Sequence, residues 1–213
     1  MSELLLTPAE ARVLASLVEK SITTPQYYPL TVNAIMLACN QKTVRAPVMS
    51  LSEGEVGAAL NRLERDKLAA RDDLSGRVPK WRHQFQHQLL LKPAELAVLA
   101  TLMLRGPQTV AELRANAAAL GAPAEAEGVN LALASLADRA QPLVALLARA
   151  PGQAAARYAH LLCGSPGVSA EALAEPAPPR PAMTASLEFR LQVLEARVAE
   201  LERRFAAADE RAG

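Results

Sequence analysis

The sequence predicts a mainly α-helical α+β fold with small β-hairpins, in which one structural unit is written twice. Ala and Leu dominate the apolar composition and aromatic residues make up only 3% of the chain, a balance that favours helix over sheet. The stretch LTPAEARVLASL at residues 6–17 returns as LKPAELAVLATL at residues 91–102. A heptad pattern near the end of the chain adds a third, separate helical element.

Each copy of the repeated stretch carries the signals of a helix start. Thr7 is placed to cap the first helix, Pro8 suits its first position, and Glu10 completes a capping box. Lys92 stands where the second copy should have its cap, so we expect that helix to begin less securely. Apolar residues at helical spacing predict a buried stripe. In the first copy the stripe comprises Leu6, Val13, Leu14 and Leu17.

The elements predicted after each start are also repeated. In residues 1–90, YPLTVNAIMLACN predicts a second helix, and SEGEVGAALNRLERDKL predicts a third that opens with a Ser52–Glu55 capping box. LAARDD and RVPKWRHQF predict a hairpin around a DLSG turn. The predicted inward face of the third helix comprises Val56, Ala59, Leu60 and Leu63. In residues 91–164, the same order is followed by TVAELRANAAAL, with a Thr109–Glu112 capping box, by AEGVNLALASLADR, and by the pair LVALLA and ARYAHLL around a Pro151–Gly152 turn. Three helices and a β-ribbon are the elements of a winged helix, so two tandem winged-helix domains are predicted. A plain three-helix bundle is the alternative.

The remaining residues predict a linker and a short coiled-coil helix. Residues 165–186 are rich in Pro and Ala and read as a semi-rigid linker. In residues 187–207, Arg at the g positions and Glu at the e positions favour a parallel pair, and hence a homodimer. An amphipathic helix that folds back on its own chain is the alternative. The predicted dimer seam comprises Leu187, Leu191, Leu194, Val198, Leu201 and Phe205.

No pattern for catalysis, a cofactor or a metal is found in the sequence. Phosphate-binding glycine loops, the HExxH helix and the GxSxG elbow are all missing. His83 and His87 fall in and just after a predicted strand, too far apart for one ion, so they are interpreted as solvated. Cys39 and Cys163 form no CxxC and are interpreted as reduced structural thiols. We therefore expect a protein that is not an enzyme.

Charge and hydropathy narrow the class of partner. The net charge of +1 gives no field that would draw the whole molecule to nucleic acid or to an anionic membrane. No uninterrupted apolar stretch approaches the roughly twenty residues that a bilayer requires, and the N-terminus lacks the pattern of a signal peptide. We expect a cytoplasmic protein with no membrane partner.

Cations gather locally where a winged helix would touch a phosphate backbone. These cations lie before and on the third helix and in the first hairpin. At the start of the third helix, however, the carboxylates of Glu53 and Glu55 would repel the DNA phosphates. The run Asn40–Thr43 is interpreted as capping and loop ordering rather than ligand binding, and Tyr27 and Tyr28 as packing residues. The predicted contacts with double-stranded DNA are Lys42, Arg45, Arg62, Arg77, Lys80 and Arg82.

Several segments also resemble a known family. LTPAEARVLASLVEKSITTPQYYPL, CNQKTVRAPVMSLSE, RVPKWRHQF, LRGPQTVAELR and RYAHLLCG are similar to the YceH family of bacterial proteins, and TTPQYYPL followed by ACNQKT is the distinctive motif. The resemblance spans about residues 4–164 and implies tandem winged helices without an established activity. It transfers no catalytic residue.

Two functions follow from these patterns. In the first, a dimeric regulatory protein grips DNA phosphates through the basic hairpin of residues 1–90. In the second, the tandem winged helices and the coil form a protein-interaction adaptor that does not bind DNA, because winged helices also serve as protein-binding modules.

Overall fold

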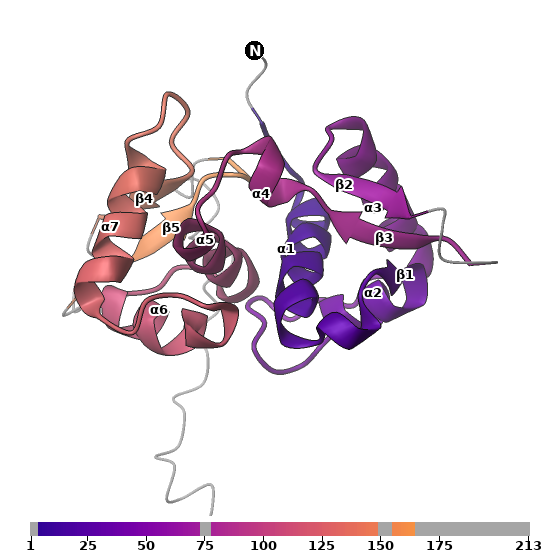
Figure 1. Cartoon of the computed structure of the whole chain (residues 1–213), viewed down its shortest axis with the longest axis horizontal. Helices are drawn as coiled ribbons and strands as arrows, with labels where there is room; N and C mark the ends of the chain where they lie inside the picture. Colours follow the sequence, from indigo (N-terminus) through magenta and orange to yellow (C-terminus); the bar gives the residue numbers. More distant parts are fainter. Residues whose placement is uncertain (1–3, 73–77, 149–154, 165–213) are drawn as a thin grey trace, which may run out of the picture. The chain divides into compact units, whose positions relative to one another are not determined.

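The computed structural model describes residues 4–72, 78–148 and 155–164. Over these residues the protein is mainly helical, with seven α-helices, one three-stranded antiparallel sheet and one two-stranded antiparallel sheet (Figure 1). This confirms the predicted α+β class. The predicted linker at 165–186, the predicted coil at 187–207 and both predicted hairpin turns, DLSG and Pro151–Gly152, lie outside the described residues. The division into domains at 1–90 and 91–164 stays a prediction, and residues Met1–Pro166 cluster into one compact unit.

Helix α1 (Pro8–Thr23) begins as predicted. The hydroxyl of Thr7 accepts the N–H of Glu10 at 3.2 Å, and the Glu10 carboxylate accepts the N–H of Thr7 at 2.9 Å. The reciprocal bonds satisfy two donors that a helix start otherwise leaves unpaired. The predicted stripe is buried, since Leu6 is 5% exposed and Val13, Leu14 and Leu17 are fully covered.

Helix α2 (Val32–Cys39) is shorter than predicted. The Thr31 hydroxyl caps it by accepting the N–H of Ala34 at 3.3 Å, so the preceding residues are not helical. Leu30–Thr31 instead form a two-residue strand, β1. A short 3₁₀ turn, η1 (Pro25–Tyr27), lies between α1 and β1. The prediction missed β1 because its partner strand lies far along the chain.

Helix α3 (Glu53–Arg65) and a hairpin complete the first repeat. The Ser52 cap is confirmed, and Val56, Ala59, Leu60 and Leu63 point inward as predicted. Strands β2 (Ala69–Asp72) and β3 (Lys80–His83) pair antiparallel. Strand β1 joins the other edge of β3 through Leu30 opposite Trp81, which gives the sheet order β1-β3-β2. A four-residue helix, α4 (Phe85–Gln88), then leads to the second repeat.

The second repeat has the same order of elements: α5 (Pro93–Arg105), α6 (Val110–Ala117), the 3₁₀ turn η3 (Ala118–Leu120), α7 (Ala126–Ala137), β4 (Val144–Leu146) and β5 (Tyr158–His160). Thr109 and Glu112 form the predicted capping box of α6. At the start of α5 the N–H of Lys92 donates to Glu95 at 3.0 Å. A lysine side chain has no acceptor for the Glu95 N–H, so half of that box is missing, as expected.

A further correspondence links the two repeats. Just before α6, Gln108 and Tyr158 exchange backbone N–H···O bonds of 3.0 and 2.7 Å. Leu30 pairs with Trp81 at the same place before α2. Each repeat therefore ties the residue ahead of its second helix to its last strand.

The two repeats pack on each other through α1 and α5, which lie side by side at the centre of Figure 1. Both helices are buried along most of their length, α1 from Ala11 to Glu19 and α5 from Glu95 to Leu104. The N–H of Ala46 donates to the Leu104 carbonyl at 2.9 Å, and the N–H of Leu6 donates to the Leu162 carbonyl at 2.7 Å. One apolar core therefore runs through both repeats.

Candidate nucleic-acid interface

The structure separates the predicted cationic contacts into three groups. Lys42 is exposed in the segment between α2 and α3, Arg62 is exposed on α3, and Lys80 and Arg82 lie on β3 with Arg82 exposed. Arg77 lies outside the described residues. Arg45 is only 6% exposed and belongs to a different environment.

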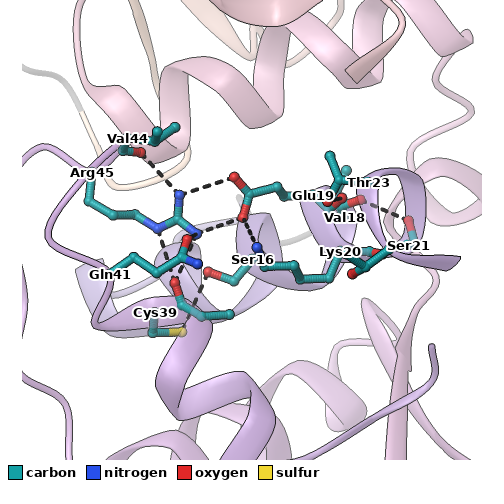
Figure 2. Close-up of polar contacts among 12 residues, drawn as sticks. Ser16, Val18, Glu19, Lys20, Ser21, Thr23, Cys39, Gln41, Val44 and Arg45 are labelled. Atoms are coloured by element: carbon teal, nitrogen blue, oxygen red, sulfur yellow. Dashed lines mark hydrogen bonds and ion pairs between the residues drawn. The ribbon is translucent and has the colours of Figure 1, made fainter. Parts of the chain in front are cut away.

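Arg45 is a buried ion-pair partner rather than a surface cation (Figure 2). Its guanidinium donates to the two carboxylate oxygens of Glu19 at 3.2 and 2.6 Å. Further bonds of 2.8 to 3.1 Å reach the carbonyls of Ala38 and Val44 and the side-chain oxygen of Gln41. The predicted phosphate contact at Arg45 is therefore corrected, because its side chain is fully covered and its donors are already used.

Arg12 is a second buried cation, which the sequence analysis missed. It is 1% exposed within α1, and its guanidinium donates to the carbonyls of Cys39 at 3.2 Å and Pro47 at 2.8 Å. Burial lowers the pKa of Arg12, and the charge of Arg45 lowers it further. Arg12 and Glu19 stand seven residues apart, so they share one helix face. A basic and an acidic residue at that spacing, at the two ends of the mainly apolar run from Val13 to Val18, were the available signal.

The segment between α2 and α3 is closed at its base by Asn40. The amide nitrogen of Asn40 donates to the Leu51 carbonyl, and its amide oxygen accepts the Leu51 N–H, both at 2.8 Å. Gln41 supports Arg45 in the same segment. The predicted loop-ordering role of the polar run is confirmed for these two residues. Residues 40–51 therefore hold a defined path from α2 to α3.

The exposed face of α3 divides into an acidic start and a more basic end. Near the start, Glu55 accepts the N–H and the hydroxyl of Ser52 at 2.8 and 2.7 Å, and these bonds lower the pKa of its carboxyl. Near the end, Arg62 and Arg65 are exposed, and Arg62 pairs with Asp66 at 3.0 Å. A groove of about 320 Å³ runs beside this face. Its lining comprises Thr7, Ala9, Glu10, Glu55, Ala58, Ala59, Arg62 and Arg65.

The hairpin combines a buried indole with exposed cations. Trp81 is 4% exposed, and the Arg71 guanidinium lies 4.9 Å from the centre of its ring while pairing with Glu64 at 3.5 Å. Arg82 donates to Asp72 at 2.5 Å. Lys80 makes no ion pair with any other described residue. In its described part, the hairpin therefore combines Lys80, which has no ion pair there, with cations that already hold a carboxylate.

His83 is not solvated, contrary to the prediction. Its Nε2 lies 3.1 Å from the hydroxyl of Ser21, and its backbone N–H donates to the Tyr28 hydroxyl at 2.6 Å. Burial lowers the pKa of His83 to about 4, with a smaller contribution from His87. His87 is exposed as predicted. No group of three metal-ligating side chains occurs within residues 4–72, 78–148 and 155–164.

The predictions for the two tyrosines and the two cysteines are confirmed in some cases and wrong in others. Tyr28 packs against the core as predicted, and burial raises its pKa to about 12. Tyr27 is 71% exposed, so its predicted packing role is wrong. Cys39 and Cys163 are both free thiols, the first buried and the second exposed. A structural role for the thiol is thus supported at Cys39.

The third helix and the hairpin of the second repeat offer no comparable cationic surface in their described parts, and the exposed Arg114 of this repeat lies on α6 instead. Helix α7 contains no Lys or Arg, and Arg149 of the second hairpin lies outside the described residues. Arg157 pairs with Glu112 at 2.9 Å and donates to the Pro107 carbonyl at 2.8 Å. His160, at the end of β5, is half-buried, and burial lowers its pKa to about 4.

Within the described residues, none of the helices is long and apolar enough to cross a bilayer.

Comparison with known proteins gives one consistent family. A family model described as "Protein of unknown function, DUF480" matches residues 6–153. A UPF0502 protein of Geobacter sulfurreducens is 48% identical over 202 residues, which cover 94% of this chain and 88% of the relative. A UPF0502 protein of Azoarcus is 46% identical over 94% of this chain and 91% of its own length. One of Pelobacter propionicus is 50% identical over 76% of this chain and 74% of its own.

Proposed function

The chain belongs to the DUF480 family of bacterial proteins, and we propose that it is a non-enzymatic winged-helix protein that binds double-stranded DNA in a regulatory role. The order α1-β1-α2-α3-β2-β3 and the sheet order β1-β3-β2 support a winged helix in the first repeat. The second repeat matches it element by element, with the Gln108–Tyr158 bridge in place of β1. The tandem arrangement is inferred from that match.

The observation that carries the proposal is the location of exposed and partly exposed cations in the first repeat. Arg62 and Arg65 on α3 and Lys80 and Arg82 on β3 occupy the two elements that a winged helix offers to DNA. Contacts of this kind with phosphates supply most of the affinity for duplex DNA. The acidic start of α3 argues that the DNA approaches the basic half of that helix.

We propose that two chains pair through the heptad seam at residues 187–207. One DNA-contacting repeat per chain then becomes two per dimer, and the linker at 165–186 sets the reach between them. A cytoplasmic location fits this role.

The test is binding of the full-length protein to random-sequence duplex DNA at two salt concentrations. Replacing Arg77, Lys80 and Arg82 together by Ala is expected to lower affinity at low salt and to reduce the slope of log K against log salt by about 2 to 3. Replacing Arg114 and Arg157 by Ala in the second repeat is the matched control and is expected to retain binding. Equal binding by the triple variant and the wild type would reject the hairpin as a DNA contact.

A second candidate function, a protein-interaction adaptor, is favoured by the outer face of α7. Leu131 on that face is 65% exposed, and α7 carries no Lys or Arg, so this face offers no cation for a phosphate contact. The adaptor predicts no duplex affinity above background. It also predicts that a partner captured by the full-length protein is lost when Leu194 and Leu201 become Asp. Unchanged capture would remove the coil from that mechanism.

A further inference from the structure

We infer that Lys67, in the turn between α3 and β2, is a phosphate contact of the first repeat. This inference rests on the proposed DNA binding and extends it to a residue outside both the third helix and the hairpin. It is carried by the conformation of the turn and by the unpaired charge that the turn presents.

The turn has a geometry that normally calls for glycine. The N–H of Lys67 donates to the Glu64 carbonyl at 3.0 Å and the N–H of Leu68 to the Leu63 carbonyl at 2.8 Å. These two bonds define a Schellman motif, in which the residue after the helix cap is left-handed. Lys67 occupies that position with φ of +57°. A side chain is disfavoured there because its Cβ crowds the backbone, so glycine is the usual choice.

No contact within the described part of the fold uses the Lys67 side chain. This side chain is exposed and makes no hydrogen bond or ion pair with the residues that the structure describes. The turn is anchored by the side chains on either side of Lys67, since Leu63 and Leu68 are both fully buried in the core. The strained position therefore carries a charge that the folded chain itself does not use, which is a feature of functional sites.

The surrounding charges point to an anionic partner. Arg65, two residues earlier, is also exposed and without an ion pair among the described residues, whereas Arg62 and Arg71 already hold Asp66 and Glu64. Two unpaired cations thus lie at the end of α3 farthest from Glu53 and Glu55. Duplex DNA approaching the basic half of α3 would bring its phosphates to this end.

A helix C-terminus offers a competing explanation, since a cation there is stabilised by the helix dipole. The two explanations differ for Lys67→Gln, which keeps the strained backbone and removes the charge. If the dipole is the reason for Lys67, this replacement lowers the melting temperature. If a phosphate is the reason, the melting temperature stays unchanged and DNA binding is weakened.

The experiment measures melting temperature and binding of random-sequence duplex DNA for full-length Lys67→Gly, Lys67→Gln and Leu90→Gly. Leu90 is the matched control because it has φ of +51° in the same kind of turn, closed by Leu91 N–H to the Gln86 carbonyl at 2.9 Å. Both glycine variants are expected to raise the melting temperature by about 1 to 3 °C. Lys67→Gln keeps the strained backbone and removes only the charge.

Only the two Lys67 variants are expected to lose affinity, by about threefold to tenfold at low salt, with the salt slope reduced by about 0.9. Wild-type affinity and slope in both variants, together with a loss in the hairpin triple variant, would overturn the inference and leave the proposed function standing. A fall in melting temperature for Lys67→Gln would also overturn it, in favour of the dipole. Absence of duplex binding by the wild type would reject both proposals.

Discussion

The two repeats share one order of helices and strands but differ in the side chains that their first helices bury at corresponding positions. In the first repeat, α1 buries Arg12 and Glu19. At the corresponding positions, 85 residues later, α5 buries Ala97 and Leu104. The same order of helices and strands is therefore found with charged or with apolar side chains at these two buried positions.

The buried charges of the first repeat serve its longer connection. Residues 40–51 join α2 to α3, and Arg12 and Arg45 bind carbonyls within that segment and at the end of α2. The second repeat spans the same gap with the turn η3 and residues 121–125. Its shorter connection is stabilised by apolar contacts such as Leu120, which is 7% exposed. The Arg45–Glu19 ion pair thus helps to stabilise the long segment of residues 40–51 and is not required by the fold.

The largest expected effect on stability comes from removing the buried Arg45–Glu19 ion pair. Replacing Arg45 by Ala leaves Glu19, whose side chain is 11% exposed, without its principal partner. Removal of one member of a buried pair typically destabilises a protein by about 3 to 5 kcal/mol. We expect a loss of that order in urea denaturation.

Arg157→Ala supplies the comparison in the second repeat. Its pair with Glu112 is more than one-third exposed on the Glu112 side, so solvent screening limits the expected loss to about 1 kcal/mol or less. Equal losses for Arg45→Ala and Arg157→Ala would show that burial does not distinguish the two pairs.

A smaller effect tests a feature that the repeats share. His83 and His160 are the last residues of β3 and β5, and burial lowers the pKa of each from 6.5 to about 4. The unfolded chain therefore binds more protons between pH 6.5 and 4, so stability is complete above pH 6.5 and is lost as the pH falls toward 4. Between pH 7 and pH 5 each histidine is expected to contribute a loss of about 1 to 2 kcal/mol.

Urea denaturation of His83→Gln and His160→Gln at these two pH values measures the contributions separately. Each variant should lose about half of the pH dependence of the wild type. A profile that is unchanged in one variant would mean that the two repeats differ at this position after all.

The smallest effect concerns the helix starts. Thr7→Ala removes a cap that the first repeat has, and Lys92→Thr adds one that the second repeat lacks. We expect a loss of about 1 kcal/mol for the first change and a gain of about 0.5 to 1 kcal/mol for the second. Thermal unfolding of both variants checks the signs, and a loss in Lys92→Thr would show that the Lys92 side chain stabilises α5 by another route.

The sequence predicted those features that depend on neighbours along the chain. The capping boxes at Thr7, Ser52 and Thr109 each join residues three apart, and all three are present. The buried faces of α1 and α3 follow from helical spacing. Strand β1 was missed because its two residues are extended only through pairing with Lys80 and Trp81.

The candidate interface was predicted less completely for the same reason. Arg62 and Arg82 are exposed as expected, but Arg45 is buried by Glu19, which lies 26 residues earlier. His83 is held by Ser21, which lies 62 residues earlier. Contacts over such separations depend on how the helices pack, which no local pattern in the sequence records. Lys67 was missed because a left-handed turn residue is ordinarily recognised by glycine.

The hydrogen bond between Leu6 and the Leu162 carbonyl has a consequence for the topology of the chain. It places the start of the first repeat beside the end of the second, so the path through both repeats nearly closes into a ring. Which repeat comes first is then a matter of where that ring is opened. Joining the two ends with a short linker and reopening the chain between α6 and α7 would yield a circular permutant with the same neighbours in space.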